Sequence, residues 1–99
     1  MSNDGTSEFL ILRELNDPIS KSDLHEAAEA SGEALEELRE EGSNIRWESS
    51  EVLRNENDGI VGTFCRYEAE SEDVIEEHAE RAGLPATKIT RRGEPLEGE

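Results

Sequence analysis

The order of the patterned segments constrains the fold of this chain more than any other feature. A strand-like stretch at residues 8–15 is followed by a helical stretch, then by two strand-like stretches, a second helical stretch and a short final strand. At residues 9–12 (Phe-Leu-Ile-Leu) both strand parities are apolar, which is typical of a central strand covered on both faces. The order strand, helix, strand, strand, helix, strand favours one antiparallel sheet covered by helices.

The first helix is predicted between a serine cap and a glycine stop. Ser20 or Ser22 can cap its start, and Asp23 falls in the first turn, where the helix dipole favours an anion. Gly42 suits the position after the last helical turn. One narrow stripe with helical spacing predicts the buried face: Leu24, Ala28, Ser31, Leu35 and Leu38.

Two strands are predicted at residues 45–53 and 60–68, separated by a turn that ends in Asp58-Gly59. The first of them alternates loosely between its two faces. This alternation predicts two sets of side chains: Ile45, Trp47, Ser49 and Glu51 on one face, and Arg46, Glu48, Ser50 and Val52 on the other.

The second helix is predicted to begin at Ser71 and to end at Gly83, and Pro85 prevents its continuation. Its apolar side includes His78 beside aliphatic residues. A short last strand follows at residues 86–91. These elements predict a single ferredoxin-like α+β domain at residues 8–91, with flexible ends at residues 1–7 and 92–99, and with the first and third strands in the centre of the sheet.

Two helices cover only one face of such a sheet, so the other face is left with apolar groups. The candidates for these groups are drawn from Phe9 to Leu12, Trp47, Phe64 and Tyr67, and the strand register decides which of them face outward. Because small monomers rarely leave a large apolar patch in water, we expect an isologous homodimer of the dimeric α/β barrel type.

The charge balance excludes several partners. The chain has 26 acidic against 10 basic residues, a formal net charge of −16. This charge repels phosphate backbones and anionic lipids, so neither nucleic acid nor membrane is expected as a partner. The self-repulsion fades at molar salt, where the Debye length is about 3 Å, and the composition is therefore typical of adaptation to high salt. Intrinsic disorder, the rival interpretation, is disfavoured by the regular apolar patterning.

The cysteine content and the first residues of the sequence indicate where the protein is expected. The one cysteine, Cys65, can form no intramolecular disulfide, which fits a reducing compartment. The first residues, MSNDGTSEF, lack the basic and apolar regions of a signal peptide. We therefore expect a cytoplasmic protein.

Few residues are candidates for chemistry. His78 is either a packed histidine bonded to a backbone carbonyl or a metal or acid–base group. Cys65 is either a small buried hydrophobic residue or a thiolate ligand for a soft metal. Glu51 and Glu68 could join a metal shell or pair with neighbouring arginines, whereas His25 is expected at the surface.

Trp47 and Tyr67 are the candidates for lining a ligand pocket, although Trp47 could equally be a core or interface anchor. No P-loop, dinucleotide-binding glycine motif, Cys-x-x-Cys pair or nucleophile elbow is present in the sequence. The absence of these motifs favours a function other than catalysis.

Three stretches resemble a known family: RWESSEV at 46–52, FCRYEAESEDVIEEHAERAGLPATKIT at 64–90, and the helix at 31–42. The chain resembles, over about residues 8–91, small bacterial and archaeal proteins of a domain-of-unknown-function family that includes a nickel-binding protein, and its acidity resembles that of haloarchaeal members. The resemblance implies a ferredoxin-like dimer and a nickel or other divalent metal ion. His78 and Cys65 match the family pattern.

One part of the family pattern is missing. Where relatives have Trp-x-His-Ser-Tyr-Val, this chain has Ser49 in place of the histidine and Glu51 in place of the tyrosine. Our first hypothesis is therefore a dimeric protein that binds a divalent metal through His78, with Cys65 and Glu51 as further ligands. The alternative is a small-molecule-binding or enzymatic dimer whose pocket is lined by Trp47, Tyr67 and the same cysteine and histidine.

Overall fold

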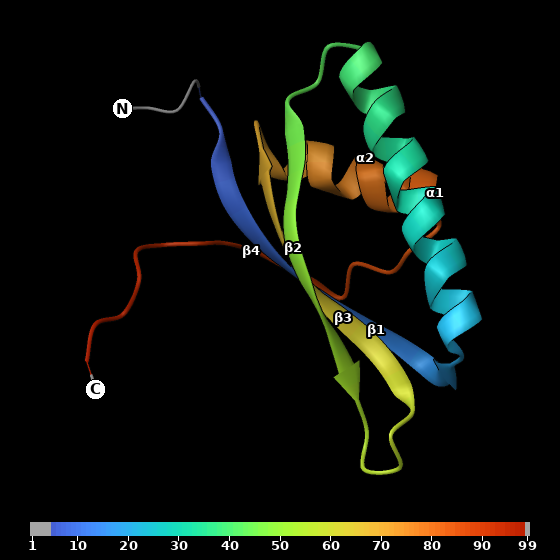
Figure 1. Ribbon diagram of the computed structural model, residues 1–99. Coiled ribbons are helices and arrows are strands. Elements are labelled where there is room, and N and C mark those ends of the chain that lie inside the picture. Colours follow the sequence, from blue (N-terminus) through green and yellow to red (C-terminus); the bar gives the residue numbers. More distant parts are fainter. Residues whose placement is uncertain (1–4, 99) are drawn as a thin grey trace.

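The computed structural model describes residues 5–98, and its elements follow the predicted order (Figure 1). The elements are β1 (Ser7–Ile19), α1 (Lys21–Glu40), β2 (Ile45–Arg54), β3 (Ile60–Ala69), α2 (Glu72–Ala82) and β4 (Lys88–Arg91). The ferredoxin-like α+β fold is thus confirmed. Residues 1–4 and 99, parts of the two ends that we expect to be flexible, lie outside the described residues.

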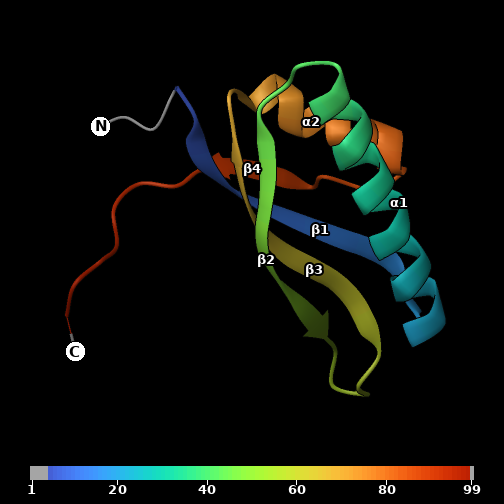
Figure 2. The same cartoon turned by 45° about the horizontal axis from the view of Figure 1, so that its top comes forward.

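The four strands form one sheet in the order β2-β3-β1-β4, and every neighbouring pair is antiparallel. The central position predicted for β1 and β3 is therefore confirmed. Figure 2 shows α1 and α2 on the same side of this sheet. Neither helix is long and apolar enough to cross a membrane, as judged over residues 5–98.

The helix ends follow their local signals. Ser20 caps α1 through a reciprocal pair of hydrogen bonds with Asp23, a capping box. Ser71 caps α2 by accepting a hydrogen bond from the Val74 amide. Gly83 ends α2 in the left-handed conformation, with φ of 70°, which glycine adopts without a steric penalty.

The core fills the space between the helices and one face of the sheet. Strand residues that share one parity pack against both helices, and these residues are Phe9, Ile11, Ile45, Cys65, Tyr67 and Ala69 from the sheet, with Leu35 and Leu38 of α1 and Ile75 of α2. The opposite parity of the central strands places Leu10, Leu12 and Phe64 on the open face, where Phe64 is 40% exposed.

β1 is longer than the sequence predicts. The end predicted near Leu15 for the strand at residues 8–15 is wrong, because β1 continues through Asn16-Asp17-Pro18 to Ile19. The pairing with β3 shifts register after Glu14 and resumes where Ile19 faces Ile60. Pro18, which has no N–H to donate, falls in this irregular part, so the strand passes the break without losing a ladder hydrogen bond at the proline.

A bulge in β2 changes the predicted assignment of its faces. Trp47 pairs with Tyr67, but Ser49 rather than Glu48 pairs with the next residue of β3. The extra residue moves the later side chains to the opposite face. Ser50 and Val52 therefore share the helix-covered face with Ile45 and Trp47, and the predicted grouping of Trp47 with Ser49 and Glu51 is wrong.

Candidate functional site

A cavity of about 390 Å³ lies between α1 and the helix-covered face of the sheet. Its walls come mainly from apolar side chains of β1, α1, β2 and β3, with the segment after α2 closing one end. The exposed lining residues mark where the cavity reaches the surface, and these are Ala28, Gly32, Trp47, Ser50 and Val52. Its volume falls within the range of small-molecule sites in proteins.

The cavity exists because the inward side chains of α1 differ in size along the helix. Toward its C-terminal end, Leu35 and Leu38 are buried in the core. The middle of the helix, after Leu24, instead presents small residues toward the sheet, and these are Ala27, Ala28, Ser31 and Gly32. Short side chains cannot fill the distance between a helix and a sheet, which leaves open volume where a core would normally be packed.

A short row of polar side chains lies at one end of the cavity. The Arg13 guanidinium lies 5.9 Å from the centroid of the Tyr67 ring, and its Nη1 donates a hydrogen bond to the Pro85 carbonyl at 2.9 Å. The Tyr67 hydroxyl and the Ser31 hydroxyl are 3.4 Å apart. Burial raises the pKa of Tyr67 above its usual value, so the phenol stays neutral near pH 7.

His78 lies behind these polar side chains rather than in the cavity wall. Its side chain is fully buried, and Nε2 lies 3.2 Å from both the carbonyl oxygen and the hydroxyl of Ser31. A carbonyl oxygen only accepts, so Nε2 carries the proton and Nδ1, which has no partner among the described residues, carries the lone pair. Burial, aided by the positive charges of Arg13 and Arg39, lowers the pKa of His78 to about 4.

Cys65 contributes its side chain to the cavity wall. Its Sγ accepts a hydrogen bond from the Ser50 hydroxyl at 2.8 Å across the β2–β3 pair. The residue is buried, as expected for a cysteine that behaves as a small hydrophobic group. Trp47 and Tyr67, predicted as pocket residues, line the same cavity, with Trp47 49% exposed at its edge.

The predicted ligand set does not assemble. Glu51 pairs with Phe64 and therefore points to the open face of the sheet, opposite to Cys65. Among residues 5–98 there is no group of three or more His, Cys, Asp or Glu side chains that could hold a metal ion. Glu68, also considered for a metal shell, forms an ion pair with Arg46 on the open face. His25 is exposed, as predicted.

Arg13 is the site residue that the sequence prediction missed. Its side chain is only 4% exposed, yet it carries a charge and lines the cavity. The signal was available in the alternation of β1, because Arg13 has the same parity as Phe9 and Ile11, whose side chains enter the core. A charge at the third inward position of the most apolar strand is the pattern that would have identified it.

A known protein family matches most of the chain. Residues 9–91 match the family described as nickel responsive protein SCO4226-like. The chain belongs to this family. The family resemblance predicted from the sequence is therefore confirmed, and the matched residues extend from β1 to the end of β4. No curated protein sequence matches the chain.

A solved structure supports the fold of this chain. The crystal structure of SCO4226 from Streptomyces coelicolor A3(2) superposes with a TM-score of 0.65 and 23% sequence identity, covering 93% of this chain and 100% of that one. The crystal structure of a putative amidohydrolase/peptidase from Burkholderia cenocepacia matches with a TM-score of 0.39 and 14% sequence identity. The match covers 90% of this chain and 28% of the other protein's chain. Only the first similarity supports the fold.

The donors of this family member do not fit a preformed nickel centre. The free Nδ1 of His78 is sealed in the core, and Glu51 lies on the other side of the sheet from Cys65. Nickel favours imidazole nitrogen, and the second histidine, His25, is exposed on α1. An ion could reach Nδ1 only if the packing between the helices and the sheet opened.

Proposed function

We propose that this family member binds a compact, largely apolar small molecule in the cavity between α1 and the sheet. The observation that carries the proposal is the cavity itself, which holds about 390 Å³ behind walls that are mostly aliphatic and aromatic. Sites for small organic ligands are typically concave and apolar, with a few polar groups that fix orientation. Here Arg13, Ser31 and Tyr67 are such polar groups.

The shape of the lining supports binding rather than a defect of packing. Empty volume beside a core destabilises a protein, roughly in proportion to the size of the void. The middle of α1 nevertheless carries small residues on its inward face, between Leu24 and Leu35. A ligand would supply the contacts that Ala27, Ala28 and Gly32 leave unmade, and its binding would stabilise the folded chain.

The test uses a neutral apolar probe, N-phenyl-1-naphthylamine, whose emission rises in apolar surroundings. We expect saturable binding at one site per chain, with quenching of Trp47, the only tryptophan in the sequence and a lining residue. Ala28→Phe, which fills the cavity, should abolish the signal. Glu29→Phe adds the same ring at an exposed neighbouring position and should leave it unchanged. Probe binding that survives Ala28→Phe would contradict the proposal.

A second candidate function is a response to nickel or another divalent metal. Family membership supports it, but Glu51 lies on the opposite face of the sheet from Cys65, and residues 5–98 contain no group of three or more His, Cys, Asp or Glu side chains that could hold a metal ion. This candidate is therefore second. Calorimetric titration with nickel in molar salt tests it, with His78→Ala and Cys65→Ser as variants. Saturable heat that is lost in both variants would establish a metal role for these residues. No saturable binding, or binding unchanged by His78→Ala, would remove this candidate.

A further inference from the structure

We infer that the ligand of the cavity carries a carboxylate and that Arg13 is the residue that pairs with it. The inference rests on the proposed function and adds the chemical class of the ligand, an apolar monocarboxylic acid with an aliphatic or aromatic body. It is carried by a buried cation that has no anionic partner among the described residues, at the wall of a cavity whose lining is mostly apolar.

The first step is the state of the guanidinium. Arginine remains protonated in proteins, so the 4% exposed side chain of Arg13 carries a full charge. Within residues 5–98 no ion pair includes Arg13. Nη1 is satisfied by the Pro85 carbonyl, but the buried Nη2 has no hydrogen-bond partner. Burying an unpaired charge is costly, and a bound anion would remove that cost.

The second step is the composition of the wall. Asp and Glu account for 26 of the 99 residues, yet none of the described residues that line the cavity is acidic. Arg13 is the one charged residue among them. The chain has a net charge of −16, but the described wall of the cavity has no carboxylate. An anion inside the cavity would therefore meet a positive local charge.

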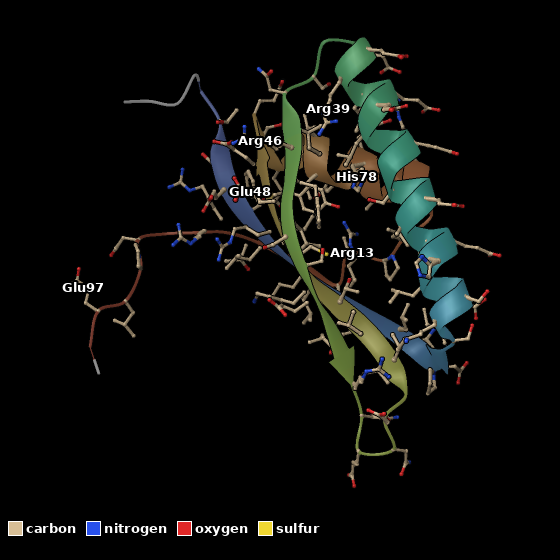
Figure 3. The ribbon with its side chains drawn as sticks, viewed as in Figure 1. Arg13, Arg39, Arg46, Glu48, His78 and Glu97 are labelled. Atoms are coloured by element: carbon tan, nitrogen blue, oxygen red, sulfur yellow. The ribbon has the colours of Figure 1, made fainter. Side chains whose placement is uncertain are left out.

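The third step is the orientation of the guanidinium. The Tyr67 ring supports one side of Arg13, with 5.9 Å between Cζ and the ring centroid, and the Pro85 carbonyl fixes Nη1. These contacts hold the side chain in place without neutralising it, so the guanidinium keeps a positive charge for a ligand to pair with. In Figure 3, Arg13 projects from β1 into the space between the sheet and α1, the side on which His78 also lies.

The ligand class follows from these three steps. A single guanidinium without an anionic partner among the described residues suits a single carboxylate, because the geometries of the two groups match. The remaining lining offers aliphatic and aromatic contact, so the rest of the ligand is apolar. Polyanions such as nucleotides are disfavoured, because the chain offers a single cation here and a strongly negative surface elsewhere.

The experiment compares decanoate with 1-decanol at pH 7.5, each competing with N-phenyl-1-naphthylamine. We expect the unmodified protein to bind the acid about tenfold or more tightly than the alcohol, the ratio typical of a charge-assisted hydrogen bond. Arg13→Met keeps the apolar stem and should bring the acid to or below the affinity of the alcohol. Arg66→Met removes the same charge from an exposed position on β3 and should leave the ratio unchanged.

The outcomes separate the two proposals. If the probe and decanol bind but decanoate binds no better, the carboxylate inference is overturned and the proposed function stands. If neither the probe nor any competitor binds, the proposed function itself fails. An equal loss of preference in Arg66→Met would assign the effect to net charge and overturn the role of Arg13. Should Arg13→Met not fold, the acid-to-alcohol ratio of the unmodified protein still decides the question.

Discussion

The imidazole Nε2 of His78 on α2 lies 3.2 Å from the carbonyl oxygen of Ser31 on α1, so a single side chain joins the two helices inside the core. The same Ser31 lines the cavity and lies within hydrogen-bond distance of Tyr67. Helix packing and the cavity wall therefore share one residue. A change that moves α1 toward or away from α2 must also change the polar end of the cavity.

His78 should make the protein less stable as the pH falls from about 6.5 toward 4. Burial lowers its pKa to about 4, against an ordinary value of 6.5, so in this window the unfolded chain binds a proton that the folded chain excludes. The loss amounts to about 3 kcal/mol of unfolding free energy over the window. Urea unfolding at pH 7 and pH 4 measures it.

The matched variants for this prediction are His78→Gln and His25→Gln. The first removes the buried imidazole, so its unfolding free energy should fall less between pH 7 and pH 4 than that of the unmodified chain. The second changes an exposed histidine and should keep the full pH dependence. Equal slopes in the unmodified chain and His78→Gln would show that carboxylates alone cause the acid sensitivity.

Replacing Glu48 by Gln should stabilise the protein at neutral pH and low salt. Partial burial, a side-chain hydrogen bond with Glu8 and the nearby negative charges raise the pKa of Glu48. A raised carboxyl pKa means that stability is lost as the pH rises through it, because the folded state favours the protonated form. We expect a melting temperature a few degrees higher at pH 7.

The gain from Glu48→Gln should shrink in molar salt and at pH 4, where screening or protonation removes the repulsion. Glu51→Gln, on the same strand, changes the net charge equally and serves as the control. Thermal melts of both variants across salt concentrations measure the difference. An identical gain in the two variants would attribute the effect to overall charge rather than to the carboxylates around Glu48.

Two glycine-to-alanine changes should have opposite effects. A Cβ at Gly62 would overlap the backbone carbonyl of Arg13 on the neighbouring strand β1. Gly62→Ala should therefore lower the free energy of unfolding by about 1–3 kcal/mol. Gly32 lies in α1 with open space around the added atom, so Gly32→Ala should stabilise the helix by up to about 1 kcal/mol. Denaturant unfolding of both variants checks the signs, and a neutral Gly62→Ala would contradict the close approach.

The open face of the sheet leads us to expect a homodimer in solution. Leu10, Leu12 and Phe64 lie in its centre, and the helices cover only the opposite face. Light scattering should give twice the chain mass, and Phe64→Ser should shift the equilibrium toward the monomer. Val52→Ser, an exposed apolar position on the other face, is the control. A monomer at all concentrations would refute this expectation.

Local signals explain why so much of the fold could be predicted. Ser20, Ser71 and Gly83 define helix ends through their own side chains or backbone conformation, so each could be read from a few neighbouring residues. The two most apolar strands lie in the centre of the sheet, and their composition alone was enough to predict this position. These features require no knowledge of distant contacts.

The candidate site was less predictable because pairing between strands decides it. Glu51 alternates correctly with Trp47 along β2, and only the register against β3 reveals the extra residue that moves it to the open face. The importance of Arg13 depends on what lies around it, namely a carbonyl 72 positions away and the ring of Tyr67. Neither contact leaves a trace in the local pattern.

The bulge at Glu48 decides which side chains of β2 reach the cavity. Without a bulge, strict alternation from Trp47 would turn Ser49 and Glu51 toward the helices in place of Ser50 and Val52. A carboxylate would then enter the wall that contains Arg13. One local irregularity of an edge strand thus keeps a negative charge out of an apolar interior.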